Sequence, residues 1–103
     1  MADRATALMP AGIPKYVRCY DNGGKTADRY TVVYTRTKGV CQYLGMNDEP
    51  FHPQGIGMHG EAPRAIDRPT SSHLGKRIKF TALPPDCQKA VRNDYREIWK
   101  LAA

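Results

Sequence analysis

Long apolar runs are missing from this chain of 103 residues, and none approaches the roughly 18 residues that a membrane-spanning helix needs. The first residues also lack the long apolar centre of a secretory signal peptide. We therefore expect a cytoplasmic protein with no membrane contact. A chain of this length fits one domain with a modest hydrophobic core.

Cysteine is scarce as well. Cys19, Cys41 and Cys87 are widely spaced and odd in number, which argues against a disulfide scaffold and provides no C-x-x-C zinc motif. We expect them to be small core residues. No catalytic or metal-binding motif specific enough to name an activity is present. The sequence therefore predicts no cofactor, no bound metal and no catalytic residue, and it favours a protein that is not an enzyme.

Acidic residues are outnumbered, since 16 lysines and arginines stand against 10 aspartates and glutamates, giving a net charge of +6. Such a surplus favours an acidic partner, and nucleic acid is the obvious candidate. Solubility alone also accounts for a charge of this size. The remaining composition, 41% hydrophobic and 25% charged, is ordinary for a soluble domain.

The hydrophobic pattern predicts an α+β fold. Residues 15–20 and 76–80 alternate between apolar and polar, and residues 28–36 and 40–44 are rich in β-branched and aromatic side chains. Asp21-Asn22-Gly23-Gly24 is a turn signal between the first two strands. We expect a small antiparallel sheet of three to four strands. Residues 1–12 are predicted to be a flexible N-terminal arm and residues 13–103 a single domain.

One C-terminal helix of about 18 residues is predicted to pack across the sheet. It opens at two prolines, which suit a first helical turn, and runs to about Leu101. Ile98 is expected in the middle of its apolar stripe, which consists of Cys87, Val91, Ile98 and Leu101, with Ala90 and Tyr95 at the borders. Asp94 falls inside this stripe, so we expect a cation or an N–H group to pair with it.

Residues 50–63 contain three prolines and three glycines, which predicts a long ordered loop. Gly55 and Gly57 are expected to include a positive φ angle. The loop has two alternative roles, docking on a host protein or, with His73, a metal or general-base site. The histidine spacing fits no metal motif, so a hydrogen bond from His52 or His59 to loop backbone is expected. The candidate residues of this loop site are Phe51, His52, Gln54, His59 and Glu61.

Several short segments together resemble a group of short proteins of bacteria and their phages that have no established activity. The resemblance spans most of the chain and implies a small accessory protein from a mobile element, without assigning a role to any residue. The segments that carry it are Cys19-Tyr20-Asp21-Asn22-Gly23-Gly24, Asp28-Arg29-Tyr30-Thr31-Val32-Val33, Tyr43-Leu44-Gly45-Met46, Phe51-His52-Pro53-Gln54-Gly55, Leu83-Pro84 and Asp86-Cys87.

Aromatic residues of the first hairpin form a possible base-stacking face. If Tyr20 pairs with Tyr30, one side of the hairpin presents four tyrosines and an arginine, a mixture that single-strand binders use. The alternative is that the helix covers the tyrosines as core, and a register shift of one residue would separate the set. The members of this face are Tyr16, Arg18, Tyr20, Tyr30 and Tyr34.

Basic residues recur at spacings of three and four along the predicted helix, which places Lys89, Arg92, Arg96 and Lys100 on one ridge. Arg77 and Lys79 add a basic face to the last strand. Such surfaces attract phosphate, although they are often simply solvated. We predict a small non-enzymatic binding protein that contacts nucleic acid or an acidic partner. The alternatives are a phage or prophage accessory protein docking on a host protein through residues 50–63, and a metal- or histidine-dependent enzyme.

Overall fold

The computed structural model describes residues 12–35, 41–62 and 74–100, with backbone alone at residues 41 and 58–62. Of the predicted arm, residues 1–12, only Gly12 lies within this part. A 3-10 helix, Phe80–Ala82, leads into the helix α1, Pro85–Trp99. The five strands are β1 Val17–Asp21, β2 Tyr30–Tyr34, β3 Cys41–Met46, β4 Ile56–Ala62 and β5 Lys76–Ile78.

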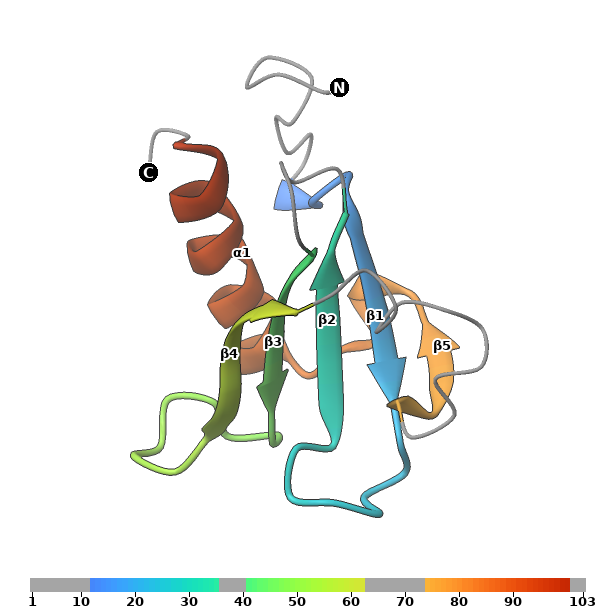
Figure 1. The fold of residues 1–103 in the computed structure, drawn as a ribbon. Helices are drawn as coiled ribbons and strands as arrows, with labels where there is room; N and C mark the ends of the chain where they lie inside the picture. Colours follow the sequence, from blue (N-terminus) through green and yellow to red (C-terminus); the bar gives the residue numbers. More distant parts are fainter. Residues whose placement is uncertain (1–11, 36–40, 63–73, 101–103) are drawn as a thin grey trace.

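The strands form one antiparallel sheet in the order β4-β3-β2-β1-β5, and α1 covers one of its faces (Figure 1). The predicted α+β class is confirmed. The sheet has five strands rather than three or four, because β4 forms from residues that were predicted to be loop. In the described ranges, α1 and the 3-10 helix are both too short or too polar to cross a membrane.

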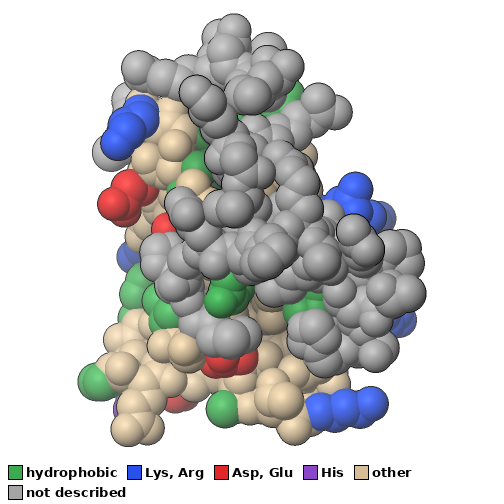
Figure 2. All heavy atoms as spheres, viewed as in Figure 1, with side chains coloured by type: hydrophobic (Ala, Val, Ile, Leu, Met, Phe, Trp, Pro, Cys, Tyr) green, Lys and Arg blue, Asp and Glu red, His purple; other side chains and the backbone are tan. Residues whose placement is uncertain are grey.

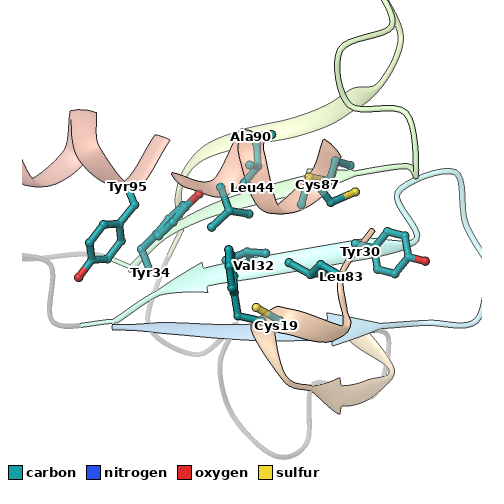
Figure 3. Close-up of a cluster of buried hydrophobic side chains, with 12 residues drawn as sticks. Cys19, Tyr30, Val32, Tyr34, Leu44, Leu83, Cys87, Ala90 and Tyr95 are labelled. Carbon is teal, nitrogen blue, oxygen red and sulfur yellow. The ribbon is translucent and has the colours of Figure 1, made fainter. Parts of the chain in front are cut away.

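The core lies between the sheet and α1, where side chains from neighbouring strands meet the helix (Figure 3). Cys19, Val32 and Leu44 stand opposite one another across β1, β2 and β3, so alternation along each strand brings all three to the helix side. Val91 of α1 is fully buried, whereas Ile98 is only partly buried. The centre of the helix stripe is therefore Val91, and each aliphatic side chain buried here contributes about 1.5–3 kcal/mol.

Helix α1 spans 15 residues, somewhat fewer than predicted. It ends because Lys100 takes a left-handed conformation, with φ at 55°, and donates its N–H to the carbonyls of Arg96 and Glu97. Asp86 in the first turn and Arg96 in the last both match the helix dipole. Lys100 consequently stands at the helix cap rather than on the predicted ridge.

The β1–β2 register differs by one residue from the one that would have assembled the aromatic face. Tyr20 pairs with Thr31, and Tyr30 pairs with Asp21. Tyr30 and Tyr34 consequently point into the core, where they are 7% and 0% exposed, while Tyr20 projects from the opposite face. The predicted base-stacking face is therefore not formed.

Tyr16 and Arg18 are the two remaining members of that face. Tyr16 packs against Trp99 of α1, with ring centroids 6.0 Å apart, so it belongs to the edge of the core. Arg18 alternates with Cys19 and therefore lies on the face away from α1, as Tyr20 does. The five residues of the set divide between the two faces of the sheet.

The β1–β2 turn forms where it was predicted. The Asn22 side chain, only 9% exposed, accepts hydrogen bonds from the N–H groups of Gly24 and Lys25 and donates to Thr26 and the Asp28 carbonyl. Gly23 and Gly24 both have positive φ angles, as this tight reversal requires. The turn fixes the end of β1 against the start of β2, since the Asn22 N–H also donates to the Arg29 carbonyl.

About half of the predicted 50–63 loop is strand β4. Residues 56–62 contain no proline and pair with β3 as an edge strand, a position that tolerates glycine. The remaining loop is closed by backbone hydrogen bonds from Asn47 to Gly55, His52 to Glu49 and Gly55 to His52, at 2.9, 3.0 and 2.8 Å. Neither Gly55 nor Gly57 has a positive φ angle, so that prediction was wrong. Glycine is needed at residue 55 because a Cβ there would overlap the Glu49 carbonyl oxygen.

Candidate functional site

A cleft opens at the β5 edge of the sheet because β5 is shorter than β1. Strand β5 pairs with Cys19, Tyr20 and Asp21, so the first residues of β1 extend beyond it. The chain then leaves the sheet after Ile78 and turns into the 3-10 helix. We name the space between the start of β1 and this turn the β1–β5 cleft, and its volume is about 510 Å³. It is lined by Ile13, Pro14, Val17, Arg18, Cys19, Arg77, Ile78, Lys79 and Phe80.

Three cations, Arg18, Arg77 and Lys79, line the β1–β5 cleft, and none of its lining residues in the described ranges is acidic. Arg77 and Lys79 are exposed and Arg18 is half-buried. In Figure 2, lysine and arginine side chains appear on the side of the molecule where β5 lies, while both basic and acidic side chains appear on the side of α1. The cleft therefore has a positive potential that favours anions.

The rest of the cleft wall is apolar. Ile13 remains 43% exposed there, beside Pro14, and Val17 and Ile78 are only partly buried. Burial raises the pKa of the Cys19 thiol to about 12, and the positive charge of Arg77 acts against that rise. The thiol is thus protonated at neutral pH and serves as wall rather than nucleophile. An anionic group attached to an apolar or flat group fits this combination of side chains.

The helix ridge is more divided than its spacing predicted. Lys89 lies with its ammonium nitrogen 5.7 Å from the centre of the Phe51 ring, toward the 47–55 loop. Arg92 packs on the other side, where a Cβ at Gly12 would lie 3.7 Å from its Cδ. Arg96 donates a long hydrogen bond, 3.4 Å, to Asn93. The three residues of the ridge thus have different surroundings, and none of them lines the β1–β5 cleft.

A second, smaller hollow lies at the opposite side of the sheet, between α1 and the 47–55 loop. We name it the α1–loop groove, and its volume is about 220 Å³. Phe51, a residue of the predicted loop site, contributes its exposed ring to this groove. Its lining consists of Leu44, Phe51, Ile56, Ala90, Asn93, Asp94 and Glu97.

Of the three histidine side chains, the structure describes only that of His52. His52 is exposed, and its Nδ1 accepts a hydrogen bond of 3.3 Å from the Gln54 N–H, which confirms the expected bond to loop backbone. Gln54 is exposed as well. His59 and Glu61 belong to β4, but their side chains, like His73, lie outside the described residues. Within the described residues, no three of His, Cys, Asp and Glu stand close enough to hold a metal ion.

Asp94 lies beside the hydroxyl of Tyr34. Burial raises the pKa of that hydroxyl well above its ordinary value, and the negative charge of Asp94 raises it further. Asp94 is half-buried, so part of its carboxylate charge also faces the α1–loop groove that it lines. The carboxylate thus stands at the boundary between core and groove.

Comparison with known proteins gave no match to any family model, curated protein or solved structure. The resemblance to short phage and bacterial proteins therefore stays a prediction. Of the residues that line the cleft, Arg18, Arg77 and Lys79 were predicted from the sequence, whereas the apolar ones were not. The available signal was Ile13-Pro14 directly before an alternating strand, since a large apolar residue there needs a neighbour to cover it.

Proposed function

We propose that this protein is a non-enzymatic binding protein whose β1–β5 cleft takes a phosphate-bearing segment of single-stranded nucleic acid. The observation that supports this proposal is that Arg18 of β1, Arg77 of β5 and Lys79, the residue after β5, line one cleft with apolar walls. Cations would contact the phosphates, and the exposed Ile13 would contact a sugar or a base.

A solvated edge strand is the simpler explanation for the charges of β5 alone, because lysine and arginine on an edge prevent pairing with other chains. That explanation requires neither a cleft nor an exposed isoleucine beside the cations. Single strands suit the cleft better than duplex, since their unstacked bases and flexible backbone can enter a confined space. With the tyrosines of the hairpin largely in the core, phosphate contacts should dominate the affinity.

The test is fluorescence anisotropy with a short labelled oligonucleotide at about 50 and about 200 mM salt. We expect the wild type to bind with strong salt dependence. Replacing Arg77 and Lys79 with Glu lowers the formal net charge from +6 to +2, two units per substitution. If two phosphate contacts are lost, the log–log salt slope for single strands should fall in magnitude by about 1.4.

The matched control is the double reversal Lys25→Glu with Lys89→Glu, which changes the net charge equally at exposed positions outside the cleft. We expect it to retain most of the affinity. Equal losses in the two variants would mean that net charge, and not the cleft, attracts the oligonucleotide. Absence of salt-sensitive binding by the wild type would remove the proposal altogether.

A further inference from the structure

The α1–loop groove has the size of one or two side chains rather than that of a whole small molecule. Its volume of about 220 Å³ is below the ~300–1,000 Å³ that is usual for small-molecule sites. A groove of this size accommodates one or two large side chains, as the anchor pockets of protein interfaces do. Its position between a helix and a loop leaves one side open to a second chain.

Phe51 is held at the surface by the ordered 47–55 loop. Pro50 before it is buried, and the turns around it are closed by the hydrogen bonds His52 to Glu49 and Gly55 to His52. The Cys87 thiol donates a hydrogen bond of 3.3 Å to the Asn47 carbonyl, which ties the start of the loop to α1. The Phe51 ring is therefore displayed by a fixed backbone.

Exposed apolar surface is concentrated at this groove. Among the described residues, three large hydrophobic side chains are exposed, and two of them, Phe51 at 55% and Ile56 at 45%, line it. Isolated exposed hydrophobic residues are ordinary, but adjacent ones around a hollow are typical of a protein-binding site. Leu44 and Ala90 continue the apolar surface toward the core.

The charge at the groove is opposite to that of the β1–β5 cleft. Asp94 and Glu97 line it one helical turn apart, and no lysine or arginine is among its described lining residues. Asp48 and Glu49 are exposed in the adjoining loop. Lys89 lies over the Phe51 ring but is not part of the lining. A partner carrying positive charge is therefore favoured over a neutral or acidic one.

We propose that the α1–loop groove docks a segment of another protein that presents one large apolar side chain followed by lysine or arginine. The apolar side chain enters between Phe51 and Ile56, and the cation faces Asp94 and Glu97. This inference is independent of nucleic-acid binding, because it uses a different surface with the opposite charge. It therefore stands or fails separately from the function proposed for the cleft.

The test uses two panels of blocked tetrapeptides in an NMR titration of the isotope-labelled full chain. One panel has Leu, Phe or Trp followed by Arg and Lys, and the matched panel has Glu in place of both cations. We expect the basic panel to shift amide signals of Phe51, Ile56, Ala90 and Asn93 saturably, and the acidic panel to leave them unchanged.

Variants then locate the contact. Ile56→Ser should weaken the best peptide by about tenfold or more. Ile13→Ser, at an isoleucine of nearly equal exposure, 43% against 45%, should not. Glu97→Lys, at an exposed position, should weaken basic peptides and favour acidic ones. Phe51→Ser provides a second groove variant should Ile56→Ser unfold the chain.

Four outcomes would overturn the inference. These are saturable shifts away from the groove, equal response to both panels, no saturable response to either, and signals that shift with protein concentration in the absence of peptide. The last would show that a second copy of this chain occupies the groove, and analytical ultracentrifugation would confirm the dimer.

Discussion

The two edges of the sheet present similar apolar exposure but opposite charge. At the β5 edge, Ile13 is 43% exposed among three cations, and at the β4 edge Ile56 is 45% exposed beside two carboxylates. The net charge of +6 describes neither surface. The difference teaches that the arrangement of charge, and not its sum, distinguishes the cleft proposed to bind nucleic acid from the groove proposed to dock a basic segment.

The edges also differ in the reason why each requires a glycine. At the β5 edge, Gly75 has a φ of +86°, and a Cβ there would overlap the Asp21 carbonyl oxygen. At the β4 edge, Gly55 has no positive φ, and only the close approach of Glu49 and Pro50 requires glycine. Substitution at the first site combines backbone strain with overlap, whereas substitution at the second brings overlap alone.

Gly75→Ala should therefore produce the largest loss of stability. Left-handed strain costs about 1–2 kcal/mol and steric overlap about 1–3 kcal/mol more. Gly24→Ala is the matched control, because Gly24 has the same φ of +86° but nothing within 4 Å of its added Cβ. Urea unfolding of both variants isolates the contribution of overlap. Equal losses of unfolding free energy in the two variants would mean that Asp21 and Asn22 move away from the added Cβ at residue 75 without an energetic cost.

Gly55→Ala is the counterpart at the other edge. We expect a loss of about 1–3 kcal/mol, confined largely to the loop, because the overlapping atoms belong to Glu49 and Pro50. Hydrogen exchange should become faster at the amides of Asn47, His52 and Gly55 while β5 keeps its protection. Faster exchange in β5 as well would show that the two edges are coupled.

Val91→Ala should affect both edges alike. Val91 is 0% exposed in the centre of the core, so its truncation should cost about 1.5–3 kcal/mol. Ile98→Ala should cost less, since Ile98 is only partly buried. Urea titration ranks the two variants. A larger effect for Ile98 would mean that the helix phase is wrong. Loss of structure at one edge alone would contradict a core shared by both edges.

Local signals predicted much of the fold. The alternation in β1, the β-branched run of β2 and the prolines at the start of α1 are signals contained in a few consecutive residues. All three elements are present. The register of β1 on β2 was not predictable, because a shift of one residue exchanges the faces of Tyr20 and Tyr30 without changing either strand signal.

Nonlocal pairing explains the other errors. Strand β4 reads Ile-Gly-Met-His-Gly-Glu-Ala, which has weak strand propensity, and it forms because β3 offers a partner. The cleft could be predicted only in part. Arg77 and Lys79 follow from alternation, but their meeting with Ile13 requires the chain order at the sheet edge, which no local pattern contains.

Cys19 and Cys87, the two cysteines whose side chains the structure describes, are both buried and allow a further comparison of the edges. Burial raises the pKa of Cys19 to about 12, opposed by Arg77, and that of Cys87 to about 11, reinforced by Asp48 and Asp86. Both values exceed the ordinary 9.0, so the folded state holds these protons more tightly than the unfolded state. The resulting stability is complete below about pH 9 and is lost as pH rises toward the folded pKa values.

Cys19→Ala should flatten the fall in unfolding free energy above pH 9 by about 1.4 kcal/mol per pH unit, measured by urea titration between pH 8 and about 10.5. Hydrogen exchange of the 47–55 loop should be unchanged in this variant. Cys87→Ala should also flatten the fall, but it removes the donor to the Asn47 carbonyl, so loop amides should exchange faster even at neutral pH. In the wild type, deprotonation of Cys87 abolishes the same bond, and high pH should loosen the α1–loop groove before the β1–β5 cleft. Identical loop exchange in the two variants would show that this thiol does not hold the loop.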